Sequence, residues 1–356
     1  MFNDFNRKNS AFQKIQDFFS EINVQCLLRK DDIELWSQVY NRLSYKPVDY
    51  LTSNIDYQSE YVSQNYDEFS DLSCIMIVDN NPISIWPLSI ASKGEDYFLS
   101  SQGSNILPPI FISDCPSKIV KKSLSATFDL INNLCEKFEI NTWSSSSIFN
   151  NNQFIQNWHL LCIEKGVESK VEYNLFIDLS LPLKEIKSKF RKSYRPLIGQ
   201  GMRLWNVKVH DHFIEHKTWK TFKKLHLDIS GRVTRSEESW NIQFNNIKIG
   251  NAFLVSVHDD KNIMVGGGYF TLSPDEGVYS VAVFNRDLFD KPLGHIVQFK
   301  AIEELKKRKV KWYEIGINIF ESDIPKPSSK ELSISHFKKG FTSLIFPEFI
   351  LKNHIK

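Results

Sequence analysis

Residues 278–317, VYSVAVFNRDLFDKPLGHIVQFKAIEELKKRKVKWYEIGI, decide the fold of this chain. The apolar run at 278–284 predicts a buried strand, the periodic apolar positions of 295–308 predict a helix, and 311–317 predicts a second strand. Strand, helix and strand in this order form a βαβ unit. The free N–H groups at the start of its helix can bind an anionic group.

The composition is that of a globular protein, with 42% hydrophobic and 24% charged residues in 356. This length predicts two domains of ordinary size. The formal net charge of +2 provides no global field for nucleic acid, and we expect no DNA partner. The five cysteines are scattered without C-x-x-C spacing, which argues against a zinc site and a disulfide framework, so we expect no metal.

No apolar run reaches the roughly 20 residues that span a bilayer, so we expect no transmembrane segment. The N-terminal residues lack the basic-then-apolar order of a signal peptide, which predicts a cytoplasmic location.

The predicted elements repeat along the chain. A hairpin, a long helix and a further strand occupy 73–91 and 116–143 in the first half, and 252–272 and 292–317 in the second. Little sequence identity accompanies this repeat. We therefore predict an α/β fold with mixed sheets in two similar domains, a degenerate copy at 1–155 and a copy at 156–356 that carries the donor site.

Several local features go with this prediction. Asp114 is expected to cap the helix at 116–138, and 45–66 is expected to be irregular. A basic helix is predicted at 183–194, with a turn around Gly199-Gln200-Gly201.

The start of the helix in the βαβ unit is the first candidate site. Gly294 and His295 open this helix and Lys291 precedes it, so the three could hold a phosphate or an oxyanion of the donor. His295 could be a general base, because an imidazole has a pKa of about 6.5. The alternative is a plain helix start in which His295 only packs or caps.

Tyr279 and Glu314 lie on the two strands that flank this helix and are the remaining acid–base candidates, with a structural role as the alternative. No Ser-His-Asp or Cys-His arrangement can be assembled from the spacing. We therefore predict direct transfer without a covalent intermediate on the protein.

The loop at 230–236, SGRVTRS, is a candidate clamp for an anionic acceptor. Arg232 and Arg235 carry forked guanidinium groups that match carboxylate or phosphate oxygens, and Ser236 adds a hydroxyl. Ion pairs with neighbouring acidic residues are the alternative. Arg195 belongs to a second basic segment with interleaved aromatic residues, which could equally be a solvated helix face.

Three strings and their order resemble the Fem-type (FemAB-like) branch of the GNAT acyltransferase superfamily: FRKSYR at 190–195, the helix at 295–308 with YEIG at 313–316, and FKKGF at 337–341. This resemblance implies two tandem GNAT-like domains and an acyl transfer to a nucleophilic acceptor. Relatives use aminoacyl-tRNA or acyl-CoA as the donor.

The resemblance also implies roles for individual residues. Phe337 would stack near the terminal nucleotide of the donor, and Lys338 would stabilise charge on the transferring ester. Arg195 would bind a phosphate of the acceptor or of tRNA. Gly267 and Gly268 would lie where a splayed strand pairs with the donor, although a bulge without a ligand also explains glycines in a strand.

We therefore expect an acyltransferase with no bound cofactor, which uses acyl-CoA or aminoacyl-tRNA as co-substrate. Its acceptor would be an amine or hydroxyl of a bacterial cell-surface glycan or envelope precursor, presented as a small sugar or a nucleotide-linked molecule, with N-acyl transfer preferred. One alternative is an aminoacyl-tRNA-dependent transferase acting on a peptidoglycan precursor. The other is a non-catalytic carbohydrate-binding protein, because the donor turn keeps one glycine of the usual loop and contains Pro292.

Overall fold

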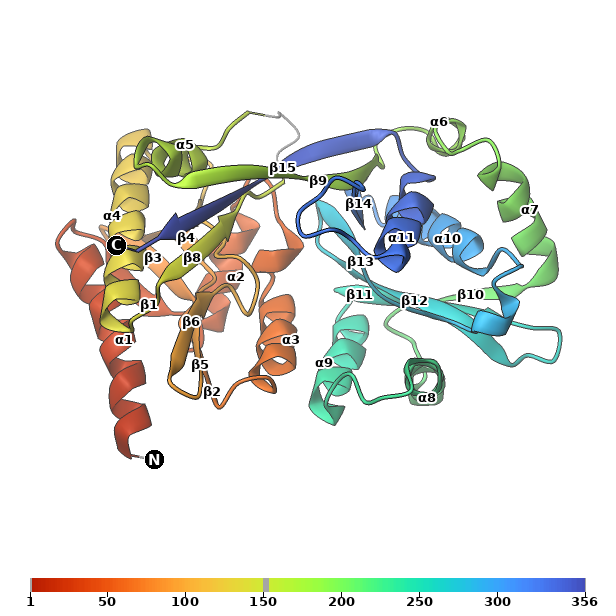
Figure 1. Ribbon diagram of the computed structural model, residues 1–356, viewed down its shortest axis with the longest axis horizontal. Helices are drawn as coiled ribbons and strands as arrows, with labels where there is room; N and C mark the ends of the chain where they lie inside the picture. Colours follow the sequence, from red (N-terminus) through yellow and green to blue (C-terminus); the bar gives the residue numbers. More distant parts are fainter. Residues whose placement is uncertain (1, 150–153, 356) are drawn as a thin grey trace. The chain divides into compact units, whose positions relative to one another are not determined.

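The computed structural model describes residues 2–149 and 154–355. It contains two compact units, one formed by Met1–Glu172 with Glu348–Lys356 and the other by Tyr173–Pro347 (Figure 1). Each unit is built around its own apolar core.

This division differs from the predicted boundary at residue 155. Helix α5 (Asn157–Glu164) belongs to the first unit, because Trp158 packs beside Trp143 and donates a 2.9 Å hydrogen bond from Nε1 to Ser145 Oγ. The end of the chain also returns to this unit. Residues 350–354 of β15 (Leu344–His354) pair antiparallel with β8 (Thr142–Ser146).

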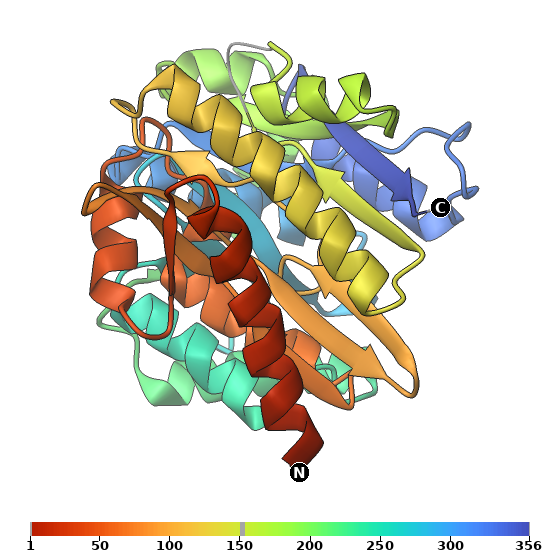
Figure 2. The same ribbon diagram turned by 90° about the vertical axis from the view of Figure 1, so that its left-hand side faces the viewer.

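Besides β8 and the end of β15, the first unit contains helices and two small sheets, and Figure 2 shows α1 and α4 side by side. The helices are α1 (Phe2–Ser20), α2 (Ile33–Asn41), η1 (Val48–Tyr50), α3 (Thr52–Ser63), α4 (Ser117–Lys137) and α5. One sheet has the order β1 (Gln25–Leu28), β3 (Cys74–Val78), β4 (Asn81–Trp86) and β7 (Ile110–Phe111). The other has the order β2 (Glu68–Asp71), β5 (Ser89–Lys93) and β6 (Asp96–Ser100).

Three predictions for this unit were wrong in detail. The hairpin at 73–91 forms, but its second strand breaks at Pro87, which has no N–H to donate to a ladder, and resumes as β5 in the other sheet. The segment 45–66 contains η1 and α3. Pro116, not Asp114, is the N-cap of α4, and Asp114 instead lies 3.5 Å from Arg42 in an exposed ion pair.

The second unit contains a sheet of strands in the order β10 (Asn206–His210), β11 (Ala252–His258), β12 (Met264–Leu272), β13 (Glu276–Phe284), β14 (Trp312–Ile317) and β9 (Glu168–Asp178). Neighbouring strands are antiparallel except β13 and β14, which are parallel. Every residue of β11 and β12 is buried, as expected for strands covered on both faces.

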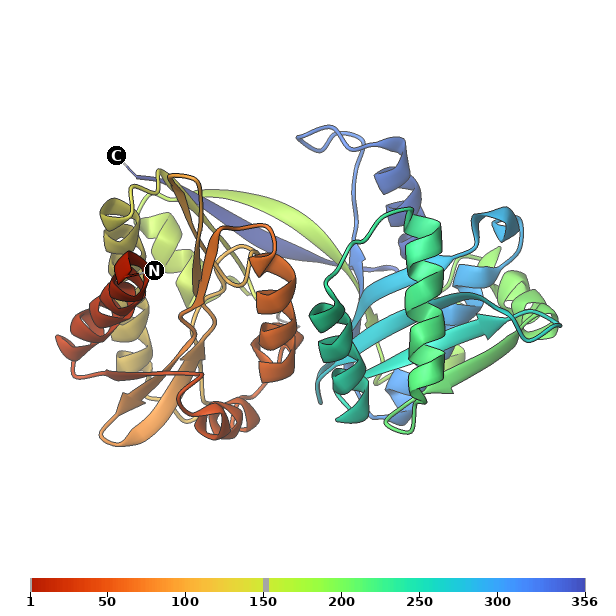
Figure 3. The same ribbon diagram turned by 90° about the horizontal axis from the view of Figure 1, so that it is seen from below.

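The helices of this unit are α6 (Leu183–Ser188), α7 (Tyr194–Leu204), α8 (His216–Ser230), α9 (Glu237–Lys248), η2 (Arg286–Leu288), α10 (Leu293–Lys307) and α11 (Ser329–Lys339). In Figures 1 and 3, α8 and α9 cover one face of the sheet, and α10 lies on the other. Two adjacent glycines mark these layers, because a side chain at Gly267 would meet Phe222 of α8, whereas one at Gly268 would meet Val297 of α10.

The predicted βαβ unit is confirmed as β13, α10 and β14. The helix predicted at 183–194 was wrong, because α6 ends at Ser188 and the chain turns so that Phe190 is buried against Phe341. The turn predicted around Gly199-Gln200-Gly201 was also wrong, since α7 continues through it. Gly201 lets α7 approach α10 closely, because a side chain there would meet Ile296.

Candidate functional site

The strands β13 and β14 separate soon after they meet. Their parallel pairing covers three positions, from Glu276 opposite Trp312 to Val278 opposite Glu314. Beyond them β13 continues to Phe284, while β14 pairs with β9 through an irregularity between Glu314 and Gly316. Among the described residues, no strand pairs with this edge of β13 after Val278. An extended ligand could therefore lie along that edge.

A polar cluster lies at the point where the strands separate. The hydroxyl of the fully buried Tyr313 donates to Oε1 of Gln298 on α10, and Tyr279 of β13 lies beside the same glutamine. Burial raises the pKa of both tyrosines above the ordinary value. Both phenols are therefore protonated at neutral pH.

Lys338 brings a positive charge to this cluster from the last turn of α11. Its Nζ lies 5.8 Å from the centre of the Tyr279 ring, and its side chain lies against Gly316. Gly316 has φ of +131°, and any side chain there would collide with Lys338. Burial lowers the pKa of Lys338, and the negative charge of Glu314 opposes that shift. The structure thus brings together Tyr279, Glu314 and Lys338, three of the four predicted catalytic residues.

The fourth predicted catalytic residue, His295, lies nearby among aromatic rings. The Tyr194 ring packs edge-on against the imidazole with 4.4 Å between the ring centres, and the centre of the Phe337 ring lies 5.2 Å from that of the imidazole. Burial, helped by the charge of Arg191, lowers the pKa of His295 to about 4. Its imidazole is therefore neutral and a weak base at neutral pH. This environment favours packing over the predicted role of general base.

Phe337 also covers the start of α10. A side chain at Gly294 would lie 2.9 Å from the Phe337 ring, so a glycine is needed for this contact. The N-cap of α10 is Pro292, which makes no side-chain capping bond. Phe337 and Lys338, consecutive in α11, therefore join the start of α10 to the polar cluster.

Trp205 was not predicted as a functional residue, but it lies beside Lys291 at the same helix start. The Nζ of Lys291 is 5.8 Å from the centre of the Trp205 ring. The Nε1 of Trp205 is buried and has no hydrogen-bond partner among the described residues. Lys291, this indole N–H and the first amides of α10 are donors suited to phosphate oxygens. The isolated tryptophan between α7 and β10 carries no spacing signal that could have indicated this.

Gly267 and Gly268 do not lie at the separating strands. Both are buried in β12, which pairs with β11 on one side and β13 on the other. The opening predicted at these glycines lies one strand further along, between β13 and β14. Here the glycines make room for Phe222 and Val297.

The predicted acceptor-binding residues make local contacts within the second unit. Arg195 donates to the Ser188 carbonyl at 2.5 Å, and Ser236 caps α9 by accepting from Ser239 N. The Arg235 guanidinium lies 5.3 Å from the Trp240 ring and donates to Thr234 Oγ1 at 3.1 Å. The loop that carries the exposed Arg232 and the half-buried Arg235 joins α8 to α9, which cover the face opposite α10.

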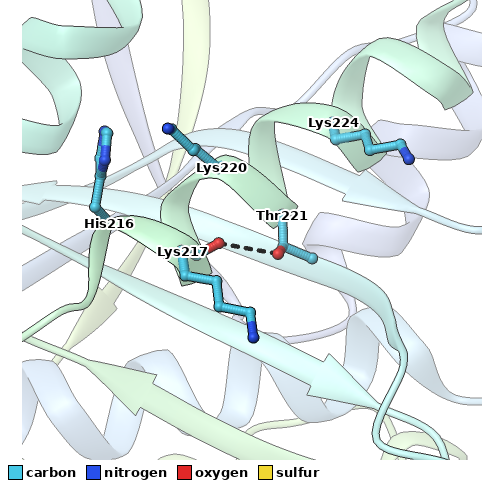
Figure 4. A pocket seen from close by; sticks show the side chains of 5 residues that line it. All are labelled: His216, Lys217, Lys220, Thr221 and Lys224. Carbon is cyan, nitrogen blue, oxygen red and sulfur yellow. Dashed lines mark hydrogen bonds between the residues drawn. The ribbon is translucent and has the colours of Figure 1, made fainter.

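A basic surface on α8 was also missed. Lys217, Lys220 and Lys224 point outward from one side of α8, together with His216 and Thr221, around a shallow depression (Figure 4). The spacing of three and four residues places the lysines on one helix face and was readable from the sequence. Such a surface suits an anionic polymer.

No known family model matches the chain, and no curated protein matches it in sequence. Its structure is similar to FemX, at 12% identity and a TM-score of 0.65, over 92% of this chain and 96% of FemX. It is also similar to the C-terminal domain of a protein described as a lysylphosphatidylglycerol synthetase from Agrobacterium fabrum, at 10% identity and a TM-score of 0.54, over 90% and 91% of the two chains.

A third similar structure is L-PGS from Bacillus licheniformis, at 9% identity and a TM-score of 0.51, over 78% of this chain and 83% of that one. In the described part of the chain, no helix is long and apolar enough to cross a membrane. The identities are low and the coverage is high, so the likeness concerns the fold. The chain has the FemAB-like fold of two tandem GNAT-like units predicted from its sequence.

Proposed function

We propose that this chain is an acyltransferase that moves an acyl group directly from acyl-CoA, or from aminoacyl-tRNA, to an amine or hydroxyl of a cell-surface glycan or envelope precursor. The observation that carries the proposal is the separation of β13 and β14 beside Tyr279, Glu314 and Lys338. The fold shared with FemX supports the same reaction class.

The proposed reaction has a simple balance of bonds. The lone pair of the acceptor nitrogen or oxygen forms a bond to the acyl carbonyl carbon, and the carbonyl π electrons move to its oxygen. When this oxyanion collapses, the C–S or C–O bond to the donor breaks. The leaving group gains a proton and the acceptor loses one.

The residues at the separating strands fit these steps. The Lys338 ammonium can stabilise the oxyanion, where negative charge develops. The protonated phenol of Tyr279 can donate to the leaving group, and the Glu314 carboxylate or a water can take the proton of the acceptor. His295 has no part in this scheme, because its low pKa makes it a poor base.

Acyl-CoA is the donor that we favour. Lys291, the Trp205 Nε1 and the start of α10 offer donors for a pyrophosphate. Aminoacyl transfer from tRNA, with a peptidoglycan precursor as the acceptor, is the second candidate function, favoured by the lysines of α8. The predicted clamp of Arg195, Arg232, Arg235 and Ser236 remains a proposal for the acceptor.

Thermal stabilisation by a ligand panel tests the proposal, because a ligand that binds the folded state raises its melting temperature. The panel contains coenzyme A, acetyl-CoA, nucleotide sugars, and charged and uncharged tRNA. We expect stabilisation by acetyl-CoA that needs no RNA. Stabilisation by charged tRNA alone, with steep salt dependence, would select the second candidate. Binding of sugars alone, without transfer, would favour the non-catalytic carbohydrate-binding protein.

A further inference from the structure

Gln298, on the helix that joins the separating strands, has half-complete hydrogen bonding among the described residues. Its side chain is fully buried in α10, and its Oε1 accepts from the Tyr313 hydroxyl. Its Nε2 has no partner in the described part of the chain. Leaving a buried donor unpaired costs stability, which makes this NH₂ group a candidate for contact with a ligand.

The two ends of this amide have different surroundings. The Tyr313 hydroxyl donates to Oε1, whereas Nε2 has no partner among the described residues. Tyr313, which donates to Gln298, and Tyr279 beside it come from the two strands that separate here. The amide therefore lies at the apex of the separation, and its NH₂ group is the end left for a ligand.

The ligand must present a hydrogen-bond acceptor, because Nε2 can only donate. Lys338 also lies at this cluster, 5.8 Å from the Tyr279 ring, and an ammonium likewise cannot accept. Two donors at one apex suit an oxygen that carries partial negative charge, such as the carbonyl oxygen of a thioester or ester.

We propose that Gln298 Nε2 donates a hydrogen bond to the carbonyl oxygen of the acyl group being transferred, and so makes Gln298 a substrate-contacting residue. This inference rests on the proposed acyl transfer and assigns the place of the acyl carbonyl within the second unit. It predicts that the protein distinguishes acylated from deacylated donors through this amide.

The test compares affinities for acetyl-CoA and coenzyme A in the wild type, Gln298→Glu and Gln298→Met, with lysyl-tRNA and uncharged tRNA as a parallel pair. Gln298→Glu keeps an acceptor for Tyr313 but loses the NH₂ group, whereas Gln298→Met loses both. Gln243→Met is the matched control, because Gln243 is also fully buried with an unpartnered amide but lies in α9 on the opposite face.

We expect the wild type to bind the acylated donor about five- to tenfold more tightly than the deacylated one, as for one hydrogen bond. Both Gln298 variants should lose this preference while their affinity for the deacylated donor is unchanged, and their turnover should fall about 10²-fold. Gln243→Met should keep the wild-type preference and turnover.

A separate measurement does not depend on a variant that folds. In wild-type protein labelled with ¹⁵N-glutamine, one side-chain amide signal should shift with acetyl-CoA and not with coenzyme A. Gln298 variants with wild-type preference and turnover, or amide signals insensitive to the acyl group, would overturn the inference and leave the proposed function standing. A wild type that binds neither donor pair would overturn both.

Discussion

Corresponding segments of the two units carry different side chains on a similar frame. In each unit a long helix precedes a strand whose second residue bonds to an amide oxygen on that helix. In the first unit, Trp143 of β8 donates from Nε1 to Asn132 Oδ1 of α4 at 2.9 Å, and Asn353 donates to the same oxygen at 3.0 Å. In the second, Tyr313 of β14 donates to Gln298 of α10.

The surroundings of the two amides differ more than the amides themselves. Trp143 packs against Phe128 and Trp158, so aromatic side chains fill the space beside Asn132. Around Gln298 lie two tyrosines and Lys338, and the amide has a free NH₂ group among the described residues. An apolar filling stabilises a fold, whereas an unpaired polar group costs stability. This contrast supports our proposal that the chemistry lies in the second unit.

Removing the positive charge of Lys338, where β13 and β14 separate, should have the largest effect on acyl transfer. We expect Lys338→Ala to lower acyl transfer by about 10²- to 10³-fold, the range seen when one oxyanion donor is lost, without unfolding the protein. Steady-state transfer rates with circular dichroism as a folding check measure this. Lys339→Ala removes the neighbouring, exposed lysine and should keep the wild-type rate. Equal rates for both variants would remove Lys338 from the mechanism.

A side chain at Gly316 should act through Lys338. Gly316→Ala places a Cβ where the lysine side chain lies and strains a backbone with φ of +131°, so we expect at least a tenfold loss of transfer and about 1–3 kcal/mol of destabilisation. Gly250→Ala is the control, since Gly250 has φ of +86° with no atom within 4 Å of an added Cβ. It should lose stability alone. A similar loss of transfer in both variants would show that strain, and not Lys338, limits activity.

The fold was more predictable from the sequence than the site. The periodic segments of β13, α10 and β14 predicted their elements closely, because each buries one apolar pattern. The break after Ser188 was not predictable, since burial of Phe190 against Phe341 depends on residues about 150 positions apart. The missed helix α11 had a readable signal, the capping box of Ser328 and Glu331.

Within the site, Lys338 and Phe337 were predicted from the family resemblance. Tyr279 and Glu314 were predicted from their positions on the two strands that flank the helix. Gln298 was missed because it lies in an apolar helix pattern, where one glutamine carries no motif. Its bond to Tyr313 and its position beside Tyr279 become visible only when the two strands and the helix are assembled.

Protonation of buried histidines should weaken both units to a similar degree. Burial lowers the pKa of His295 and of His159 to about 4, below the ordinary 6.5. Between pH 4 and pH 6.5 the folded state therefore binds fewer protons than the unfolded state. The free energy of unfolding is highest above pH 6.5 and decreases as the pH falls towards 4. His295→Phe and His159→Phe should each make the decrease in melting temperature with falling pH smaller than in the wild type. An unchanged pH profile in both would refute the low pKa values.

The smallest effect should come from the basic surface of α8. If acyl-CoA is the donor, the double variant Lys220→Glu, Lys224→Glu should keep donor affinity within about twofold, since two exposed charges act weakly over a distance in salt. If tRNA is the donor, the slope of log affinity against log salt should become shallower by roughly one for each lost phosphate contact. Affinity measured from 50 to about 300 mM salt separates the two donors.

Hydrogen exchange with and without donor tests most directly whether the second unit holds the acyl-transfer site. Acetyl-CoA, with lysyl-tRNA in parallel, should slow exchange of amides in 279–284 of β13 and 293–298 of α10, because the donor would cover the free strand edge and the helix start. The corresponding amides of α4 and β8 in the first unit should exchange as before. Protection confined to the first unit, or none at 279–284 with a donor that is being turned over, would contradict this placement.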